Sequence, residues 1–370
     1  MTPRMASIVR TTVSAVFCGA VVAMGLGVML SGVKSAADLQ QAVPLRKPLV
    51  DLNGFCQRAL GQRASNGVVL YNGGMLEDPR HIAVDISWQA GELRKWDEFA
   101  RSLGSGYLYV LAPMKLDRKL EMLPVGLDPR EHSKHETADD MLGRLGESGI
   151  ETLDLRPGFC DDLSTIRRYF FRTDHHWRYE AVMKAMPRVA RRIAKVAGKK
   201  LPADAVPLDR RNWKKHSLSG CFLGSAGRRT GSGFAGYDDF SWYTPKFKTS
   251  IELTVPSRKI KRRGGFEKSI IQPSMLANRA TFYSAYIGGL FDRVDIVNRS
   301  APCPASVVFV ADSYVRPMAG LLSTVFRKIV VLDPRRYKGG CVEFIRSARP
   351  DAVVTFVNMK FYEEEFYRFL

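Results

Sequence analysis

The chain has 370 residues, of which 45% are hydrophobic and 25% are charged, with 31 glycines and 19 prolines. This composition excludes a disordered chain, a collagen-like repeat and a protein with many membrane spans. The net charge is +19, and such an excess is typical of proteins that meet a polyanion, which means a nucleic acid, an anionic membrane surface or an acidic polysaccharide. The length allows one large α/β domain or two smaller ones.

The N-terminal segment predicts the compartment. Residues 11–33 contain no charged side chain, and as a helix they would span about 34 Å, more than the hydrocarbon core of ~30 Å. Arg4 and Arg10 precede this segment, so the positive-inside rule places residues 1–10 in the cytoplasm and everything after Val33 outside it. We predict an uncleaved signal anchor, because the apolar core of a cleaved signal peptide is usually only ~7–15 residues long. Cleavage after the small residues 35–37 is the alternative, and it also exports the main domain.

This topology changes the meaning of the charge. Residues 1–33 hold two of the 56 basic residues and none of the 37 acidic ones, so the rest of the chain keeps a net charge of +17. Outside the cytoplasm, an anionic envelope polymer or the outer leaflet is the expected partner, and no nucleic acid is expected. The six cysteines are scattered without Cys-x-x-Cys spacing, which disfavours a zinc ribbon or a thioredoxin-like site and leaves one or two disulfides open.

The exported part predicts alternating strands and helices after a tether over residues 34–65 that includes a first helix. Asn72-Gly73 predicts a hairpin within residues 68–76. We then expect helices over 88–103, 136–149, 179–196, 317–326, 342–347 and 363–370, and strands over 107–112, 150–155, 307–310, 329–332 and 352–357. Residues 208–276 are expected to form a β-rich or loop insertion. The alternation predicts a parallel sheet covered on both faces.

The first chemical motif is Thr173-Asp174-His175-His176-Trp177. In an extended segment Asp174 and His176 project to the same side, where a carboxylate can fix the imidazole tautomer and support its charged form. A metal site is disfavoured, because it needs three or four ligands and the other histidines show no matching pattern. On residue types alone, a catalytic pair and a purely structural Asp–His pair are about equally supported.

The second motif is Ala311-Asp312-Ser313, which ends the apolar run over 307–310 and is followed by Pro317 near a predicted helix start. Ser313 is thus expected at the carboxyl end of a strand, where open α/β sheets bind ligands and where helix amides can stabilise an oxyanion. The alternative is that Asp312 and Ser313 only cap the helix. A Gly-x-Ser-x-Gly elbow is absent, but the two motifs together supply a Ser-His-Asp triad.

TDHHW followed by a strand that ends in Asp-Ser resembles the DHHW family, whose members are similar to the AlgX/AlgJ-type alginate O-acetyltransferases of the SGNH hydrolase superfamily. The resemblance covers roughly residues 66–370 and implies a flavodoxin-like α/β/α sandwich with the SGNH elements in permuted order. It implies that Asp174 orients, His176 is the base and Ser313 is the nucleophile. It further implies that His175 and Trp177 shape the site and that a membrane-bound O-acyltransferase supplies acetyl groups. We expect His175, Trp177 and Tyr314 to contact substrate, and we expect no cofactor.

The sequence departs from the family pattern in places. Ala311 stands where Gly-Asp-Ser is common, and the Gly-x-Asn-Asp block is missing, so the Ser313 amide is the only oxyanion donor that we can name. The glycine-rich segment over 224–236 lacks Gly-Lys-Ser/Thr and is therefore no phosphate-binding loop. It is either a substrate flap, with Arg228 and Arg229 contacting an anionic sugar, or, as we prefer, a solvated surface loop.

The sequence thus predicts an extracytoplasmic O-acetyltransferase that modifies a cell-envelope polysaccharide or exopolysaccharide through an acyl-serine intermediate, without a metal. Two alternatives stay open. One is a carbohydrate acetyl esterase that uses the same triad with water as the acceptor. The other is a non-catalytic protein that binds a polysaccharide or an acyltransferase.

Overall fold

The computed structural model describes residues 46–78, 85–125, 134–278, 281–289, 291–359, 361 and 363–369. The predicted anchor over residues 11–33 and most of the tether lie outside these ranges. Within them, no helix combines the length and the apolar character that crossing a membrane requires.

The described chain begins with a helix and a small antiparallel sheet. The helix is α3 (Arg46–Ala59), and the strands are β1 (Ala64–Ser65), β2 (Val68–Leu70) and β3 (Leu76–Glu77). Leu70 pairs with Leu76 across the predicted hairpin, which is confirmed. Gly73 and Gly74 in its turn have φ of 71° and 76°, a backbone conformation that glycine adopts without steric cost.

An eight-stranded sheet forms the centre of the molecule. Its spatial order is β5 (Thr152–Asp154), β4 (Gly106–Leu111), β13 (Ala352–Val357), β11 (Cys303–Ala311), β12 (Phe326–Leu332), β10 (Arg293–Asn298), β8 (Ile251–Val255) and β9 (Ile260–Gly264). The strands from β5 to β12 are parallel, as predicted. The strands from β12 to β9 pair antiparallel, so the prediction of an all-parallel sheet is wrong at this edge.

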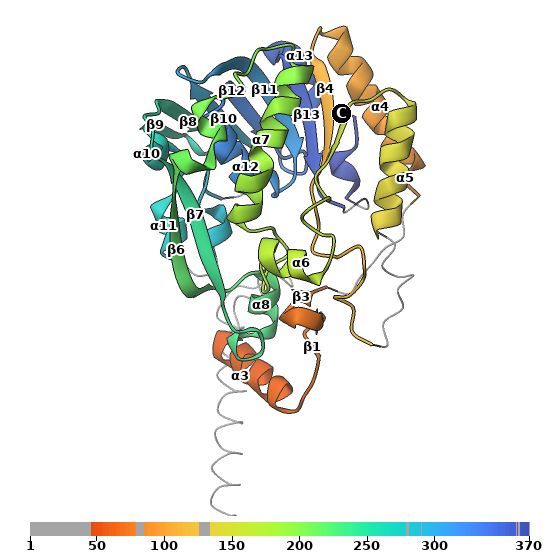
Figure 1. The fold of residues 1–370 in the computed structure, drawn as a ribbon, viewed down its shortest axis with the longest axis vertical. Coiled ribbons are helices and arrows are strands. Elements are labelled where there is room, and N and C mark those ends of the chain that lie inside the picture. The colour runs from red at the N-terminus through yellow and green to blue at the C-terminus, as the bar shows by residue number, and fades with distance from the viewer. Residues whose placement is uncertain are drawn as a thin grey trace, which may run out of the picture.

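Helices cover both faces of the sheet (Figure 1). Helices α7 (Tyr179–Val196) and α12 (Val315–Leu322) lie on one face, and α4 (Ser87–Ser102), α5 (Lys134–Glu147) and α13 (Cys341–Ala348) lie on the other. Alternate residues of β11 divide between the two layers, because Phe309 packs with the α7 side and Val308 with the α4 side. This alternation makes an α/β/α sandwich.

Two helix predictions need correction. The helix expected over 317–326 begins and ends earlier, as α12, because Phe326 already opens β12. The terminal helix expected over 363–370 is a single 3-10 turn, Glu364–Phe366, in the described part of that segment.

The stretch over 208–276 only partly forms a separate insertion. Strands β6 (Trp213–Phe222) and β7 (Asp238–Pro245) form an antiparallel hairpin, which runs away from the central sheet towards α8 and α3 in Figure 1. Strands β8 and β9 from the same stretch instead extend the central sheet through β10. Short helices α10 (Phe266–Ile270) and α11 (Pro273–Leu276) follow them.

The glycine-rich segment over 224–236 is neither a flap nor a solvated loop. It forms two short helices, α8 (Ser225–Thr230) and α9 (Ser232–Ala235), which pack against α3. Gly231 between them has φ of 83°, and a Cβ there would lie 2.5 Å from the Val50 carbonyl oxygen. The small residues are therefore needed because the helices approach α3 closely.

Three of the cysteines are buried away from solvent. Cys160, Cys303 and Cys341 are buried free thiols, so none of these three forms a disulfide. Burial raises the pKa of Cys160 and of Cys341 to about 12, and both therefore stay as unreactive thiols at neutral pH.

Candidate active site

The structure brings Asp174, His176 and Ser313 into one hydrogen-bonded chain. Ser313 follows β11 at the carboxyl edge of the sheet, and the other two lie in the loop between α6 (Leu163–Tyr169) and α7. Nε2 of His176 lies 2.7 Å from Oγ of Ser313, and Nδ1 of His176 lies 2.5 Å from Oδ1 of Asp174. With Nδ1 protonated towards the carboxylate, Nε2 is free of hydrogen and can accept the Ser313 proton.

Asp174 is buried but stays ionised. Burial alone would raise the pKa of its carboxyl, but the nearby imidazoles of His176 and His175 and hydrogen bonds to the carboxylate hold that pKa well below its usual value. The amide of Ser225 donates to Oδ2 at 2.7 Å, and the amide of His176 donates to Oδ1 at 3.0 Å. A fixed negative charge thus orients the imidazole and supports its protonated form.

A buried aspartate on β7 fixes the loop from one side. Oδ2 of Asp238 accepts hydrogen bonds of 2.7 Å from both the amide and the hydroxyl of Thr173, and Oδ1 accepts one of 2.9 Å from the Arg172 amide. The Thr173 hydroxyl also accepts from the Gly224 amide at 2.9 Å. The hairpin and α8 are therefore part of the support of the catalytic loop.

A buried lysine fixes the same loop from the other side. The side chain of Lys115 is 0% exposed, and its ammonium group lies 3.4 Å from the carboxylate of Glu77. It donates to the carbonyl oxygens of Asp174 at 2.7 Å and of Leu76 at 2.5 Å. Lys115 thereby ties the loop to strand β3, and a charged group is tolerated here because several acceptors surround it.

Trp177 and Tyr314, which were predicted to contact substrate, instead hold the catalytic loop in position. Trp177 is 0% exposed and Tyr314 is 1% exposed, and neither lines the cavity over Ser313. The Trp177 indole donates to the Tyr314 carbonyl at 3.3 Å, and the Tyr314 hydroxyl donates to the His175 carbonyl. These bonds join the loop to the start of α12. His175 does line the cavity, as do Asp174 and His176, and its Nδ1 lies 3.0 Å from the Ser225 hydroxyl.

A cavity of about 470 Å³ opens over Ser313. Its wall contains four arginines, Arg228, Arg316, Arg335 and Arg336, together with the acids Asp174, Asp312 and Glu363. Arg228 therefore lines the cavity over Ser313, and its contact with an anionic sugar stays a prediction. Arg229 does not line this cavity, and it pairs with Asp78 at 3.1 Å and donates to the carbonyl of Gly67.

Several residues of the cavity were missed in the sequence, and two of them, Tyr283 and Arg316, lie beside the triad. Tyr283 stacks on the imidazole of His176 with ring centroids 3.7 Å apart and planes inclined by 19°, and no local pattern signals this contact. Arg316 lies three residues after Ser313, at the start of α12, and its place just after the predicted strand end could have identified it.

The helix-capping alternative applies to neither Asp312 nor Ser313, because the N-cap of α12 is Tyr314 and no side chain caps the helix there. Oδ1 of Asp312 accepts from the Tyr314 amide at 2.8 Å, and Oδ2 accepts from the Asn358 amide at 3.3 Å. The Ser313 hydroxyl instead faces His176. Asp312 thus shapes the turn that presents the serine.

The adjacent histidines also raise the question of a metal. Asp174, His175 and His176 each offer a ligand atom, and these atoms lie within 4.8 Å of one another. Two ligands of one tetrahedral zinc ion lie about 3.3 Å apart, because each bond is about 2.0–2.1 Å long. The 2.5 Å separation between Asp174 and His176 is too short for shared coordination and fits a hydrogen bond.

A serine, a histidine and an aspartate that meet at the carboxyl edge of an α/β/α sandwich are the arrangement expected of an SGNH hydrolase-like fold. Residues 70–244 match the family described as the SGNH hydrolase-like domain of the acetyltransferase AlgX. This match confirms the predicted resemblance and the enzyme class, an SGNH-type O-acetyltransferase. No curated protein matches the chain.

Two solved structures show the same fold. Bacillus cereus PatB1 with a sulfonyl adduct is 16% identical, with a TM-score of 0.67 over 81% of this chain and 98% of its own. A DHHW family protein from Eubacterium siraeum DSM 15702 is 18% identical, with a TM-score of 0.62 over 83% of this chain and 97% of its own. The SGNH-like α/β fold predicted from the sequence is thereby confirmed, with a mixed sheet in place of a parallel one.

Proposed function

We propose that the protein is an extracytoplasmic O-acetyltransferase that acetylates a cell-envelope polysaccharide or exopolysaccharide. The observation that carries this proposal is the hydrogen-bonded chain from Asp174 through His176 to Ser313 at the floor of an arginine-lined cavity. The family match to an acetyltransferase domain favours transfer over hydrolysis.

The geometry supports a two-step acyl transfer. His176 takes the Ser313 proton as Oγ attacks the acyl carbonyl carbon of a donor, and the leaving group departs with the proton that His176 returns to it. The product is acetyl-Ser313. His176 then removes the proton of a sugar hydroxyl, which attacks the acyl carbon, and the bond to Oγ breaks as the proton returns to Ser313.

Charge around the site favours an anionic acceptor and stabilises the intermediate. Negative charge develops on the acyl oxygen in both steps, beside the N-terminus of α12 and the guanidinium of Arg316. Arg228, Arg335 and Arg336 supply further positive charge on the cavity wall, which suits a polymer with carboxylate or phosphate groups. The donor we propose is a membrane-bound O-acyltransferase, which the segment over 11–33 would hold nearby as a single-pass anchor.

The test compares the full chain with Ser313→Ala in detergent, using an acetyl ester as donor and a sugar oligomer as acceptor. We expect Ser313-dependent acetylation of the oligomer and an acetyl adduct on Ser313 in the intact mass, both resistant to chelators. Ser274→Ala, an exposed serine on α11, is the matched control and should keep full activity.

Each other result supports a different conclusion. Full activity of Ser313→Ala would show that Ser313 is not the nucleophile. Release of acetate with no acetylated oligomer would favour the esterase, and complete inactivity of the wild type with polymer binding would favour the non-catalytic partner. In cells, a strain that carries Ser313→Ala should make polymer without its acetyl groups.

A further inference from the structure

A second, much smaller cavity adjoins Ser313. Its volume is about 20 Å³, and it shares Asp312, Ser313 and Arg316 with the large cavity, whose volume is about 470 Å³. Ser313 therefore lies where a large polar space meets a small one. His176 lines only the large cavity, so proton transfer takes place on that side.

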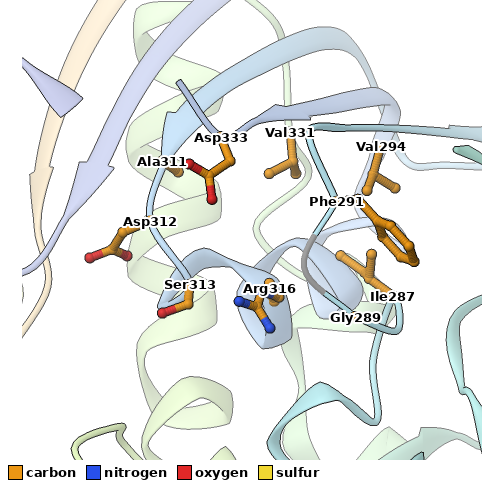
Figure 2. A pocket seen from close by; sticks show the side chains of 10 residues that line it. All are labelled: Ile287, Gly289, Phe291, Val294, Ala311, Asp312, Ser313, Arg316, Val331 and Asp333. Carbon is orange, nitrogen blue, oxygen red and sulfur yellow. The ribbon is translucent and has the colours of Figure 1, made fainter. Parts of the chain in front are cut away.

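The small cavity is apolar at the end away from the serine. Figure 2 shows Val331, Val294, Phe291 and Ile287 gathered on one side and Ser313 with Asp312 on the other. Val331 on β12 and Val294 on β10 are direct partners in the sheet, and both are buried. Part of the far wall of the cavity is thus made from paired strand positions, and Phe291 and Ile287 complete it from the segment that precedes β10.

The charged groups of its wall have partners elsewhere. The Asp333 carboxylate pairs with the Arg335 guanidinium at 2.9 Å, and the Arg316 guanidinium donates to the Ser284 hydroxyl at 3.2 Å. The Asp333 carboxylate is thus already paired, and Arg316 also lines the large cavity, so the apolar side chains make the rest of the small cavity suited to an apolar group.

The volume limits that group to about the size of a methyl. A cavity must offer about 10–15 Å³ to the centre of a water molecule in order to hold one, and this cavity offers about 20 Å³. A second methylene would have to displace strand side chains in a close-packed layer, which is costly.

The side chain of Ala311 adds to this limit. It lies at the end of β11 and lines the small cavity (Figure 2). A glycine at this position, as in the Gly-Asp-Ser of similar proteins, would leave the space of that methyl group open.

We propose that the small cavity is the acyl pocket, and that Ala311, Val331 and Val294 restrict the acyl group on Ser313 to acetyl. This inference rests on the proposed function. While the acyl carbon is bonded to Oγ, its methyl group occupies the small cavity. The leaving group departs into the large cavity, and the sugar hydroxyl then attacks the acyl carbon from the large cavity.

The test measures kcat/KM of the full chain on 4-nitrophenyl acetate, propionate and butyrate. One methylene in a tight pocket is worth roughly 10–200-fold, so the wild type should prefer acetate to propionate by at least about tenfold. Val331→Ala and Ala311→Gly should each lower that preference several-fold. The matched control is Val330→Ala, because Val330 is the neighbouring buried residue of β12 and packs on the opposite face of the sheet.

The ratio of two esters does not depend on the fraction of folded enzyme, so a loss of stability does not disturb it. Ser313-dependent hydrolysis with a wild-type ratio in both Val331→Ala and Ala311→Gly would overturn the acyl pocket and leave the proposed function standing. An equal change in Val330→Ala would also overturn it. Absence of Ser313-dependent hydrolysis of every ester would overturn the proposed function, and the pocket with it.

Discussion

At the scale of single residues, the site depends on a carboxylate that stays charged where water is excluded. Asp174 receives the imidazole of His176 and two backbone amides, and these contacts hold its pKa well below the ordinary value. Asp174→Asn should lower kcat/KM by at least about 10²-fold, because an amide nitrogen facing Nδ1 disfavours the tautomer that accepts the serine proton. The measurement is ester hydrolysis by purified protein of equal folded content.

The same substitution predicts a change in the pH dependence of stability. Since the folded-state pKa of Asp174 lies below its unfolded value, its contribution is fully present above about pH 4 and is lost as the pH falls through the folded pKa. The difference in free energy of unfolding between the wild type and Asp174→Asn should therefore be constant from about pH 6 to about pH 4 and should shrink as the pH falls from about 4 to 3 in urea titrations. A difference that stays constant below about pH 4 as well would contradict the depressed pKa.

Arg316 is the second residue whose charge matters. It lines both cavities, and among the described residues no carboxylate lies within 4 Å of its guanidinium. Burial lowers its pKa, yet guanidinium stays charged in proteins, so this cation lines the cavities beside Ser313, where the proposed reaction would form an oxyanion. Arg316→Gln should lower kcat/KM by roughly 10²-fold, whereas Arg299→Gln, on the exposed surface, should leave it unchanged.

At the scale of elements, the catalytic loop is held by the hairpin of β6 and β7. Asp238 at the start of β7 accepts three hydrogen bonds from Arg172 and Thr173. Asp238→Ala leaves these donors unsatisfied and should lower the free energy of unfolding by about 3 kcal/mol or more. Its exposed neighbour Asp239 accepts one bond from the Gly220 amide, and Asp239→Ala should cost less than about 1 kcal/mol in the same urea titration.

Activity separates support of the loop from support of the fold. We expect Asp238→Ala to lose ester hydrolysis even at temperatures at which its circular dichroism is that of the wild type, because the position of Asp174 depends on Thr173. Full activity of the folded variant would show that the loop holds its geometry without β7.

The elements also show how far the sequence could predict this fold. Strands β4, β11 and β13 are buried on both faces, so each is a continuous apolar run that periodicity identifies. Strand β10 alternates half-buried and buried residues and was missed, and β8 and β9 were placed in an insertion, since pairing at an edge leaves little local signal. The small residues of α8 and α9 resemble a loop unless their contact with α3 is known.

In the site, as in the fold, residues with a local sequence pattern could be predicted and residues that act through tertiary contacts could not. Asp174 and His176 are two residues apart, and Ser313 ends a strand, so local patterns identify all three as candidates. Lys115, Asp238 and Tyr283 come from three other elements and act only through tertiary contacts. Sequence patterns carry little information about such contacts, because each residue alone resembles an ordinary surface or core position.

At the scale of the whole molecule, charge and apolar surface gather in different places. The arginines of the large cavity lie at the carboxyl edge of the sheet, whereas Leu52, Phe55 and Leu60, at and just after α3, are 60%, 62% and 73% exposed. Figure 1 shows α3 at the end of the molecule opposite the central sheet. This arrangement is consistent with a domain that turns its α3 end to a membrane.

The anchor over residues 11–33 is the last prediction. Arginine at the centre of a membrane helix costs about 2.5–3.5 kcal/mol, so Val22→Arg together with Met24→Arg should prevent insertion. The wild type should sediment with membranes through an alkaline wash, and alkaline phosphatase fused after Leu370 should be active. The double arginine variant should lose both properties, while Val22→Leu with Met24→Leu should keep them. A wild-type chain that leaves the membrane with a mature N-terminus near residue 37 would establish the cleaved signal peptide in place of the anchor.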